Sequence, residues 1–245
     1  MNKEKIALIT GANKGIGASI AKQLASEGFN IWLNYYSDDI AANKIKLDIE
    51  KNKVQCVLLK FDVADYKVTN LALSDLLKKD TPFVVVNNAG FTSHKFLVDL
   101  DFKEWEAVIA VTLNGFFNIT KPIITKMIER KQKGRIINIA SMAAHGGQKG
   151  FVHYATAKAG LVAATRSLAM ELAQYDILVN AVSPGFIETD RLRLANLPLA
   201  QIAQTIPLKR LGLSMDVSNA VSFLVSNKSS YITGQEIHVN GGYYM

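Results

Sequence analysis

Cysteine is nearly absent from this chain of 245 residues, which contains only Cys56. One cysteine cannot form a disulfide within the chain, so a disulfide-stabilised secreted scaffold is excluded. Cys56 lies inside the apolar run "VQCVLL", which predicts a buried structural thiol, with a catalytic role as the remote alternative.

Long hydrophobic runs are also missing. No apolar stretch reaches the length needed to cross a bilayer, so membrane insertion is not expected. The N-terminus, "MNKEKIALIT", passes directly from charged residues into a short apolar run and lacks the pattern of a secretory signal. We therefore expect a cytoplasmic protein.

Motifs for binding nucleic acid are absent, although the formal net charge is +7. The chain has no basic region with heptads, no zinc-ligand spacing and no aromatic RNA-binding signature, and its four histidines share no metal-ligand spacing. We expect no nucleic-acid partner and no metal, and we place His94, His145 and His153 on loops or the surface, with a position beside the substrate cleft as the alternative for His153. The densest basic stretch, residues 125–135, is either a solvated helix end or a docking surface for an acidic partner. Its cations are Lys126, Arg130, Lys131, Lys133 and Arg135.

Short β-rich runs alternate with helical segments from end to end. Most of the runs are continuously apolar, as expected for strands covered on both faces of a sheet. The predicted strands are residues 5–10, 30–35, 54–61, 83–88, 134–140, 177–183 and 235–240, and helices are predicted at 15–28 and 37–52, among others. No linker or repeat interrupts them. The sequence predicts a single α/β domain over residues 1–245: a doubly wound, Rossmann-type, seven-stranded, mostly parallel sheet flanked by helices.

A glycine-rich turn, "TGANKGIG" (10–17), joins the first strand to the first helix, with Gly11, Gly15 and Gly17. Such a turn exposes backbone N–H groups and a helix N-terminus to a phosphate, and glycines let the chain approach closely. An ordinary tight turn is the alternative. The position of the segment 10–17 between a strand and a helix favours dinucleotide binding.

The end of the second strand bears on the choice between NAD and NADP. An acid there would bind a free ribose 2′-hydroxyl, but residues 34–37 contain none. Asp38, Asp39 or Ser37 suits a helix cap better. Lys14 and Ser37 could hold a 2′-phosphate, so NADPH is the predicted cofactor.

Tyr154 and Lys158 lie four residues apart in "FVHYATAKAG", one turn of a helix. The spacing also arises by chance, so it needs a context before it indicates chemistry. Ser141 stands thirteen residues before Tyr154, and "NNAG" (87–90) and "SPGFIET" (183–189) flank this region.

Together these motifs, in this order, resemble the short-chain dehydrogenase/reductase family over nearly the whole chain. Within it, "YATAKAGL", "PGFIET" and "YITGQEIHVNGG" look most like the bacterial 3-oxoacyl-acyl-carrier-protein reductases. The resemblance implies NADPH-dependent reduction of a 3-oxoacyl thioester to the 3-hydroxyacyl thioester. Alternatives are a dehydrogenase of a small polyol, sugar or steroid, or a cofactor-sensing protein without turnover.

The resemblance also implies roles for residues. Tyr154 would donate a proton to the substrate oxygen, Lys158 would stabilise the phenolate, and Ser141 would orient the carbonyl. Thr112 stands where the family usually has an asparagine of the proton relay, and we expect it to be a tolerated substitute. Cofactor contacts are expected, besides Tyr154 and Lys158, at Gly11, Asn13, Lys14, Gly15, Ile16, Gly17, Ser37, Asp62, Val63, Asn88, Ala89, Gly90, Pro184, Gly185, Ile187 and Thr189.

Two further expectations concern larger surfaces. Residues 189–204 would form a mobile lid over the substrate, with inert packing as the alternative. The resemblance implies a homotetramer paired through helices near 101–131 and 151–174. It also implies an acyl carrier protein as partner, for which the basic patch at Arg130, Lys131 and Lys133 is the expected docking site.

Overall fold

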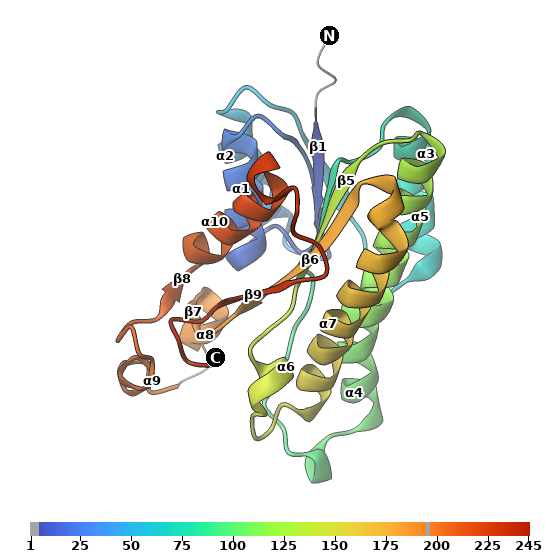
Figure 1. The fold of residues 1–245 in the computed structure, drawn as a ribbon. Coiled ribbons are helices and arrows are strands. Elements are labelled where there is room, and N and C mark those ends of the chain that lie inside the picture. The colour runs from blue at the N-terminus through green and yellow to red at the C-terminus, as the bar shows by residue number, and fades with distance from the viewer. Residues whose placement is uncertain (1–4, 195–196) are drawn as a thin grey trace.

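The computed structural model describes residues 5–194 and 197–245. Seven strands form one sheet in the order β3-β2-β1-β4-β5-β6-β9, and every neighbouring pair is parallel (Figure 1). The strands are β1 (Ile6–Ile9), β2 (Asn30–Tyr35), β3 (Cys56–Lys60), β4 (Val84–Asn87), β5 (Gly134–Ile139), β6 (Ile177–Pro184) and β9 (Glu236–Val239). The predicted doubly wound α/β fold is confirmed.

Helices cover both faces of this sheet. The helices α1 (Gly15–Ser26), α2 (Asp39–Glu50) and α10 (Ser214–Val225) lie on one face, and α3 (Tyr66–Lys79), α5 (Gly115–Glu129) and α7 (Val152–Leu172) on the other. Every residue of β1, β4 and β5 is buried. These strands are mostly apolar, with Asn87, Arg135 and Asn138 as buried exceptions, because side chains on both sheet faces meet a helix layer.

Shorter elements complete the described chain. They are η1 (Leu97–Asp99), α4 (Phe102–Ile109), the π-helical turn η2 (Ala110–Asn114), α6 (Ala143–Gly146), η3 (Ala173–Tyr175), β7 (Ile187–Glu188), α8 (Asp190–Leu194), α9 (Leu199–Thr205), β8 (Gly212–Leu213) and η4 (Asn227–Ser229). The lid expected at residues 189–204 corresponds to α8 and α9, and residues 195–196 lie outside the described part. Its mobility stays a prediction.

Local signals place the ends of the first helices. Gly28, the last residue of the helix predicted over 15–28, adopts φ +87° just beyond α1, and its N–H donates to the Ala25 carbonyl. This left-handed conformation favours glycine, which has no Cβ. At the start of α2 the Asp38 carboxylate accepts a hydrogen bond from the Ala41 N–H, as the sequence predicts for this segment.

The run formed by α4, η2 and α5 is long and apolar enough, by length and composition alone, to pass a test for a membrane span. Its most apolar 18-residue window has a mean hydropathy of 1.4 and is 39% buried. In the fold, α5 packs against α3 and β4, and α4 packs against α7. Many apolar side chains of this run therefore pack within a helix layer of the α/β domain.

The single thiol is buried, as predicted. Burial raises the pKa of Cys56 to about 12, with a smaller contribution from Glu50. A thiol that stays protonated is a poor nucleophile, so Cys56 packs as a small apolar residue.

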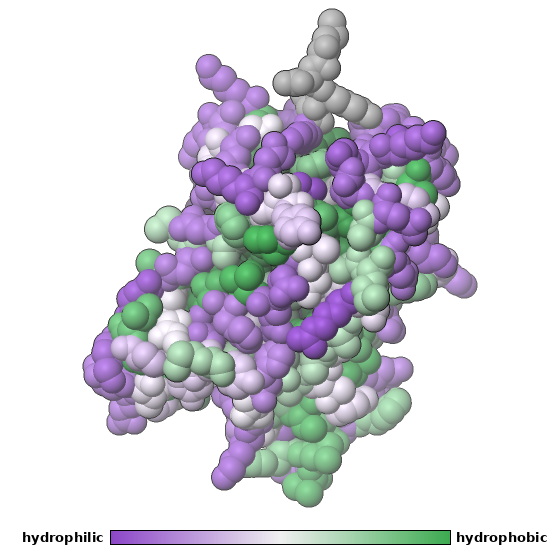
Figure 2. Space-filling model, in the orientation of Figure 1, coloured by the Kyte–Doolittle hydropathy of each residue, from purple (hydrophilic) through white to green (hydrophobic). Residues whose placement is uncertain are grey.

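Because all seven strands are parallel, their carboxyl ends meet along one edge of the sheet. The strand order reverses between β1 and β4, where α/β folds bind ligands. This carboxyl edge lies toward the bottom of Figure 1, and the amino edge toward the top. In Figure 2, hydrophilic side chains cover the top, and apolar ones gather at the lower tip around η1 and the start of α4.

Candidate active site

The glycine-rich turn between β1 and α1 requires glycine for two different reasons. Gly11 and Gly15 have φ angles of +60° and +56°, in the left-handed region. At Gly17, a Cβ atom would lie 2.5 Å from both Asn88 Nδ2 and the Gly11 carbonyl oxygen. A larger residue would therefore push the "NNAG" segment away from the turn.

Thr10 and Asn88 bind these two segments together. Asn88 Nδ2 donates to the carbonyl oxygens of Thr10 (2.8 Å) and Gly11 (3.1 Å). In return, Thr10 Oγ1 accepts hydrogen bonds of 2.9 Å from the N–H groups of Asn88 and Ala89. The predicted cofactor residues Asn88 and Ala89 thus sit on a fixed platform beside the glycine turn.

Asn34 is a positioning residue that the sequence analysis missed. Its side chain is buried, donates to the carbonyl oxygens of Leu59 and Phe61, and accepts from the Gly11 N–H at 3.3 Å. It therefore holds β2, β3 and the glycine turn in register. A buried amide in a strand end was the available signal, but its partners lie 23 to 27 residues away.

The first turn of α1 suits a bound phosphate. Its N-cap residue, Lys14, makes no side-chain capping bond within the described residues, and the turn contains no acid. The N–H groups at the start of this twelve-residue helix, including that of Ile16, have no acceptor within the helix and can bind a ligand. The residues present fit the diphosphate of a dinucleotide.

The end of β2 lies against the same turn. Asn13 Nδ2 donates to the Ser37 carbonyl oxygen at 2.9 Å, so the loop with Lys14 and the segment with Ser37 meet, and both of these residues are exposed. The nearby acids face other groups. Asp38 caps α2, while Asp39 accepts from Lys60 Nζ (2.6 Å) and from the Tyr35 hydroxyl (2.8 Å), which lowers the pKa of Asp39.

Asp62 and Val63 follow β3 at the carboxyl edge. Asp62 accepts a hydrogen bond from the Ala64 N–H through Oδ1 at 2.9 Å. The Val63 carbonyl accepts from Asn118 Nδ2 at 2.8 Å, and its side chain packs so tightly on Gly115 that a Cβ there would lie 2.8 Å from Val63 Cγ2. Both residues are fixed where a cofactor contact was predicted.

The segment after β6 approaches the glycine turn from the other side. At Gly185, a Cβ would lie 2.7 Å from Asn240 Cβ, so only glycine fits beside the last strand. Beyond Ile187, the Thr189 methyl group lies 3.7 Å from the Cβ position of Gly15. Pro184, Gly185, Ile187 and Thr189 therefore belong to the same edge as the turn.

Ser141 lies just beyond β5, before α6. Its side-chain oxygen accepts from the Ala143 N–H at 3.2 Å, and the Met142 N–H donates to the Pro184 carbonyl at 3.1 Å. Ser141 is 8% exposed. The loop is thus tied to the end of β6, with the serine hydroxyl at the carboxyl edge.

Tyr154 and Lys158 lie one turn apart at the start of α7, which packs against β5 and β6. Lys158 is buried, its Nζ donates to the Ile139 carbonyl at 2.6 Å and lies 5.6 Å from the centre of the Tyr154 ring. Ile139 ends β5, two residues before Ser141. The predicted Ser141, Tyr154 and Lys158 therefore occupy one edge of the sheet.

Thr112 lies in the π-helical turn η2, which packs against α7. It is buried, and Oγ1 has no hydrogen-bond partner within residues 5–194 and 197–245. A Cβ added at Gly90 would lie 3.5 Å from Lys158 Nζ and 3.8 Å from Thr112 Oγ1, so Thr112 and Lys158 face the same glycine. Asn114, two residues further along the chain, is exposed, so it does not take the place of the asparagine that the family usually has at position 112. π-helical turns occur frequently at functional sites.

One histidine prediction is wrong. His153 was placed on a loop or the surface, but it is fully buried in α7, with Nε2 3.4 Å from Ser93 Oγ. Burial lowers the pKa of His153, and the nearby charge of Glu104 partly opposes this effect. His94 and His145 are exposed, as expected.

The arrangement can perform one kind of chemistry well. A phenol beside a buried ammonium group can give a proton to an oxygen, and the serine hydroxyl can hold a carbonyl next to it. The neighbouring edge offers glycines and a helix N-terminus for a dinucleotide. These features suit oxidation or reduction at a carbonyl or alcohol carbon.

Comparisons with known proteins agree with this chemistry. A family model described as Enoyl-(Acyl carrier protein) reductase matches residues 11–244. The chain is 40% identical over its whole length to the whole of the 3-oxoacyl-[acyl-carrier-protein] reductase FabG of Staphylococcus epidermidis. It is 39% identical to that of Aquifex aeolicus, covering 98% of this chain and 97% of that protein.

Solved structures show the same fold. The crystal structure of acetoin dehydrogenase from Enterobacter cloacae aligns with a TM-score of 0.91 and 30% identity, covering 99% of this chain and 96% of that one. Acetoin dehydrogenase YohF from Salmonella typhimurium aligns with a TM-score of 0.88 and 31% identity, covering 98% and 97%. With the family match and these full-length relatives added to the geometry, the chain is an oxidoreductase that belongs to the short-chain dehydrogenase/reductase family.

Proposed function

We propose that the protein reduces a 3-oxoacyl thioester, carried by an acyl carrier protein, to the 3-hydroxyacyl thioester with NADPH. The observation that carries this proposal is the placement of Ser141, Tyr154 and Lys158 beside the glycine turn at one edge of the sheet. The full-length relatives that are 40% identical to this chain are named for this reaction.

Each residue has a distinct task in the proposed reaction. Ser141 Oγ binds the 3-oxo oxygen and orients it, and the Tyr154 hydroxyl donates its proton to that oxygen. Lys158, held by the Ile139 carbonyl, keeps a positive charge near the phenol as the proton leaves. The reduced nicotinamide, when bound, supplies the hydride. The residues expected around it are Asn88, Ala89, Gly90, Pro184, Gly185, Ile187 and Thr189.

The preference for NADPH rests on which charges the glycine turn faces. Lys14 and Ser37 are both exposed beside the glycine turn. Asp38 instead caps the N-terminus of α2. Asp39 accepts hydrogen bonds from Tyr35 and Lys60. A 2′-phosphate therefore meets a cation and a hydroxyl, and a free ribose finds no carboxylate ready to accept its hydroxyl hydrogens.

We further propose a cytoplasmic homotetramer. Apolar side chains on the long helices are exposed in the single chain, among them Phe102 (73%), Phe117 (48%) and Met170 (84%). Pairing of these helices between copies would bury them, and exposed apolar patches of this kind mark interfaces.

The carrier docking site needs one correction. Arg130, Lys131 and Lys133 precede β5 at the amino edge, whereas Ser141 follows β5 at the carboxyl edge. Six residues of strand span about 20 Å, so the patch cannot border the site of its own chain. Lys133 is paired with Asp176 and Arg130 with the end of α3. A carrier docked there would serve the site of a neighbouring copy in the tetramer.

A substrate panel tests the proposal. Purified protein with NADPH should turn over acetoacetyl thioesters, first on a carrier protein and then on N-acetylcysteamine, far faster than diacetyl or acetoin, followed by NADPH absorbance. Acetoin is included because both solved structures are acetoin dehydrogenases. Faster turnover of the diketone than of every thioester would replace the proposal with that second candidate.

A further inference from the structure

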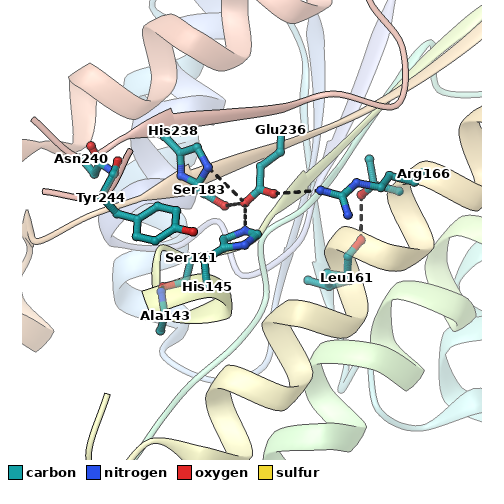
Figure 3. Close-up of polar contacts among 11 residues, drawn as sticks. Ser141, Ala143, His145, Leu161, Arg166, Ser183, Glu236, His238, Asn240 and Tyr244 are labelled. Carbon is teal, nitrogen blue, oxygen red and sulfur yellow. Dashed lines mark hydrogen bonds and ion pairs between the residues drawn. The ribbon is translucent and has the colours of Figure 1, made fainter. Parts of the chain in front are cut away.

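A second polar cluster, which contains none of Ser141, Tyr154 and Lys158, lies where α6 meets the last strand (Figure 3). His145 comes from α6, and Glu236 and His238 both come from β9, with side chains that converge over the end of β6. The His145 Nε2 atom is 2.7 Å from Glu236 Oε1, and the His238 Nε2 atom is 3.9 Å from the same oxygen. Each of the three residues offers one potential ligand atom that lies within 4.8 Å of those of the other two.

Neighbouring groups hold the cluster in place. Ser183 Oγ donates a hydrogen bond to Glu236 Oε1, and the Glu236 side chain is only 7% exposed. The ring of Tyr244 stacks on His145 and tilts against His238, with both centroid distances 5.5 Å. The carboxylate is thus buried and oriented, while the two imidazoles are partly exposed.

We propose that His145, Glu236 and His238 form a binding site for a divalent transition metal, with zinc as the best fit. Two imidazole nitrogens and one carboxylate oxygen are a ligand set that zinc uses with water in the fourth position. Zinc bonds of about 2.0–2.2 Å in a tetrahedron place donor atoms about 3.3 Å apart. The observed separations of 2.7 and 3.9 Å lie on either side of that value, so small side-chain rotations would suffice.

The charges around the cluster both help and oppose a cation. Glu236 supplies the negative charge, and Ser183 keeps its Oε1 oxygen directed toward the histidines. Arg166 Nη2 lies 3.9 Å from the other oxygen, Oε2, and its side chain is 63% exposed. Arg166 therefore repels a metal, and removing its charge should strengthen metal binding.

The proposed metal would act as a clamp between distant segments. His145 and Glu236 are 91 residues apart in the chain, which explains why ligand spacing in the sequence gave no sign of the site. Since α6 begins two residues after Ser141, a metal at this place would tie the loop that follows β5 to β9. This role is independent of the proposed reductase activity, so binding and stability are the readouts.

Zinc binding is measured on the full-length, tag-free and metal-stripped protein by competition with a chromophoric chelator. We expect one zinc per chain in the parent. Replacement of a ligand, in His145→Ala, His238→Ala or Glu236→Gln, should weaken binding at least about tenfold. His94→Ala is the matched control, because it removes an exposed histidine outside the cluster and should bind zinc as the parent does. Arg166→Gln should bind it several-fold more tightly.

Thermal melts separate loss of the site from loss of the fold. Zinc should raise the melting temperature of the parent and of His94→Ala but not that of His238→Ala, while the zinc-free melts of the three agree. A parent that binds no zinc, or a His145→Ala/His238→Ala double variant that binds and responds as the parent does, would overturn the proposal.

Discussion

The two edges of the sheet use the same kinds of polar side chain for different purposes. At the carboxyl edge, Lys158 is buried with its ammonium group held by a main-chain carbonyl, beside a tyrosine and a glycine turn. At the amino edge, Arg130 donates to the Leu77 and Lys78 carbonyls and to Thr81, at the end of α3. We propose a catalytic role for the first cation, whereas the second completes a helix end.

The difference follows from what surrounds each cation. The carboxyl edge is where the strand order reverses and where the loops with Gly11 and Gly90 lie. At the amino edge, Arg135 is buried and its guanidinium lies 5.5 Å from the centre of the Phe83 ring, so its charge is packed away. Substitutions at the two edges should therefore differ: catalysis should suffer at the first, and stability or docking at the second.

Tyr154→Phe should give the largest effect. It removes the hydroxyl that we propose as the proton donor, and general acid catalysis is worth about 10²–10⁴-fold. With a 3-oxoacyl thioester, kcat should therefore fall by at least about 100-fold with an unchanged melting temperature. Tyr175→Phe, which removes a phenol from the amino edge, is the control and should keep full activity. More than about a tenth of the parent rate in Tyr154→Phe would show that another group supplies the proton.

Lys14→Ala should come next, through the cofactor. A hydrogen bond to a charged group contributes about 1.5–3 kcal/mol, so kcat/KM for NADPH should drop about tenfold or more while that for NADH stays within about twofold. Lys44→Ala, an exposed lysine on α2, should leave both values alone. A parent protein that uses NADH and NADPH with equal kcat/KM would contradict the assignment of Lys14 and Ser37 to the 2′-phosphate.

Thr112→Val tests how far the carboxyl edge depends on the unusual threonine. The hydroxyl is buried without a protein partner in the described chain, and it faces Gly90 as Lys158 does. A water held there would link the lysine to solvent, and its loss should slow turnover by less than about tenfold. Thr112→Asn should be neutral or faster. A parent that binds NADPH yet reduces no ketone, and gains activity only with Thr112→Asn, would favour a cofactor-sensing protein.

The strands and long helices could be predicted within a few residues because their signals are local. An apolar run such as β4 is buried on both sheet faces, and Gly28 or Asp38 ends or starts a helix through its own backbone or side chain. The proximity of Tyr154 and Lys158 could be predicted for the same reason, since the two side chains are one helical turn apart. The fold then follows from alternation of these elements.

Features that depend on distant partners escaped the sequence. Asn34 gains its role from Gly11 and Phe61, and His153 is buried because α4 packs against α7. The π-helical turn around Thr112 has no compositional signal. The position of the basic stretch relative to Ser141 required knowing which end of β5 each residue occupies.

The smallest effect is expected at the amino edge, from Lys131→Glu. Lys131 is exposed and lies outside the chain's own site, so turnover of an N-acetylcysteamine thioester should not change. If the edge docks an acidic carrier for a neighbouring copy, KM for the carrier-bound substrate should rise about twofold to fivefold, the range of one exposed ion pair, and added salt should reduce the difference.

Lys53→Glu is a close control, because Lys53 is also exposed and has a similar φ of +60°, against +50° for Lys131. Any strain of a left-handed residue is therefore present in both variants. Equal responses of the two substrates, or equal effects of the two variants, would show that the basic stretch is only a solvated helix end and that the carrier docks elsewhere.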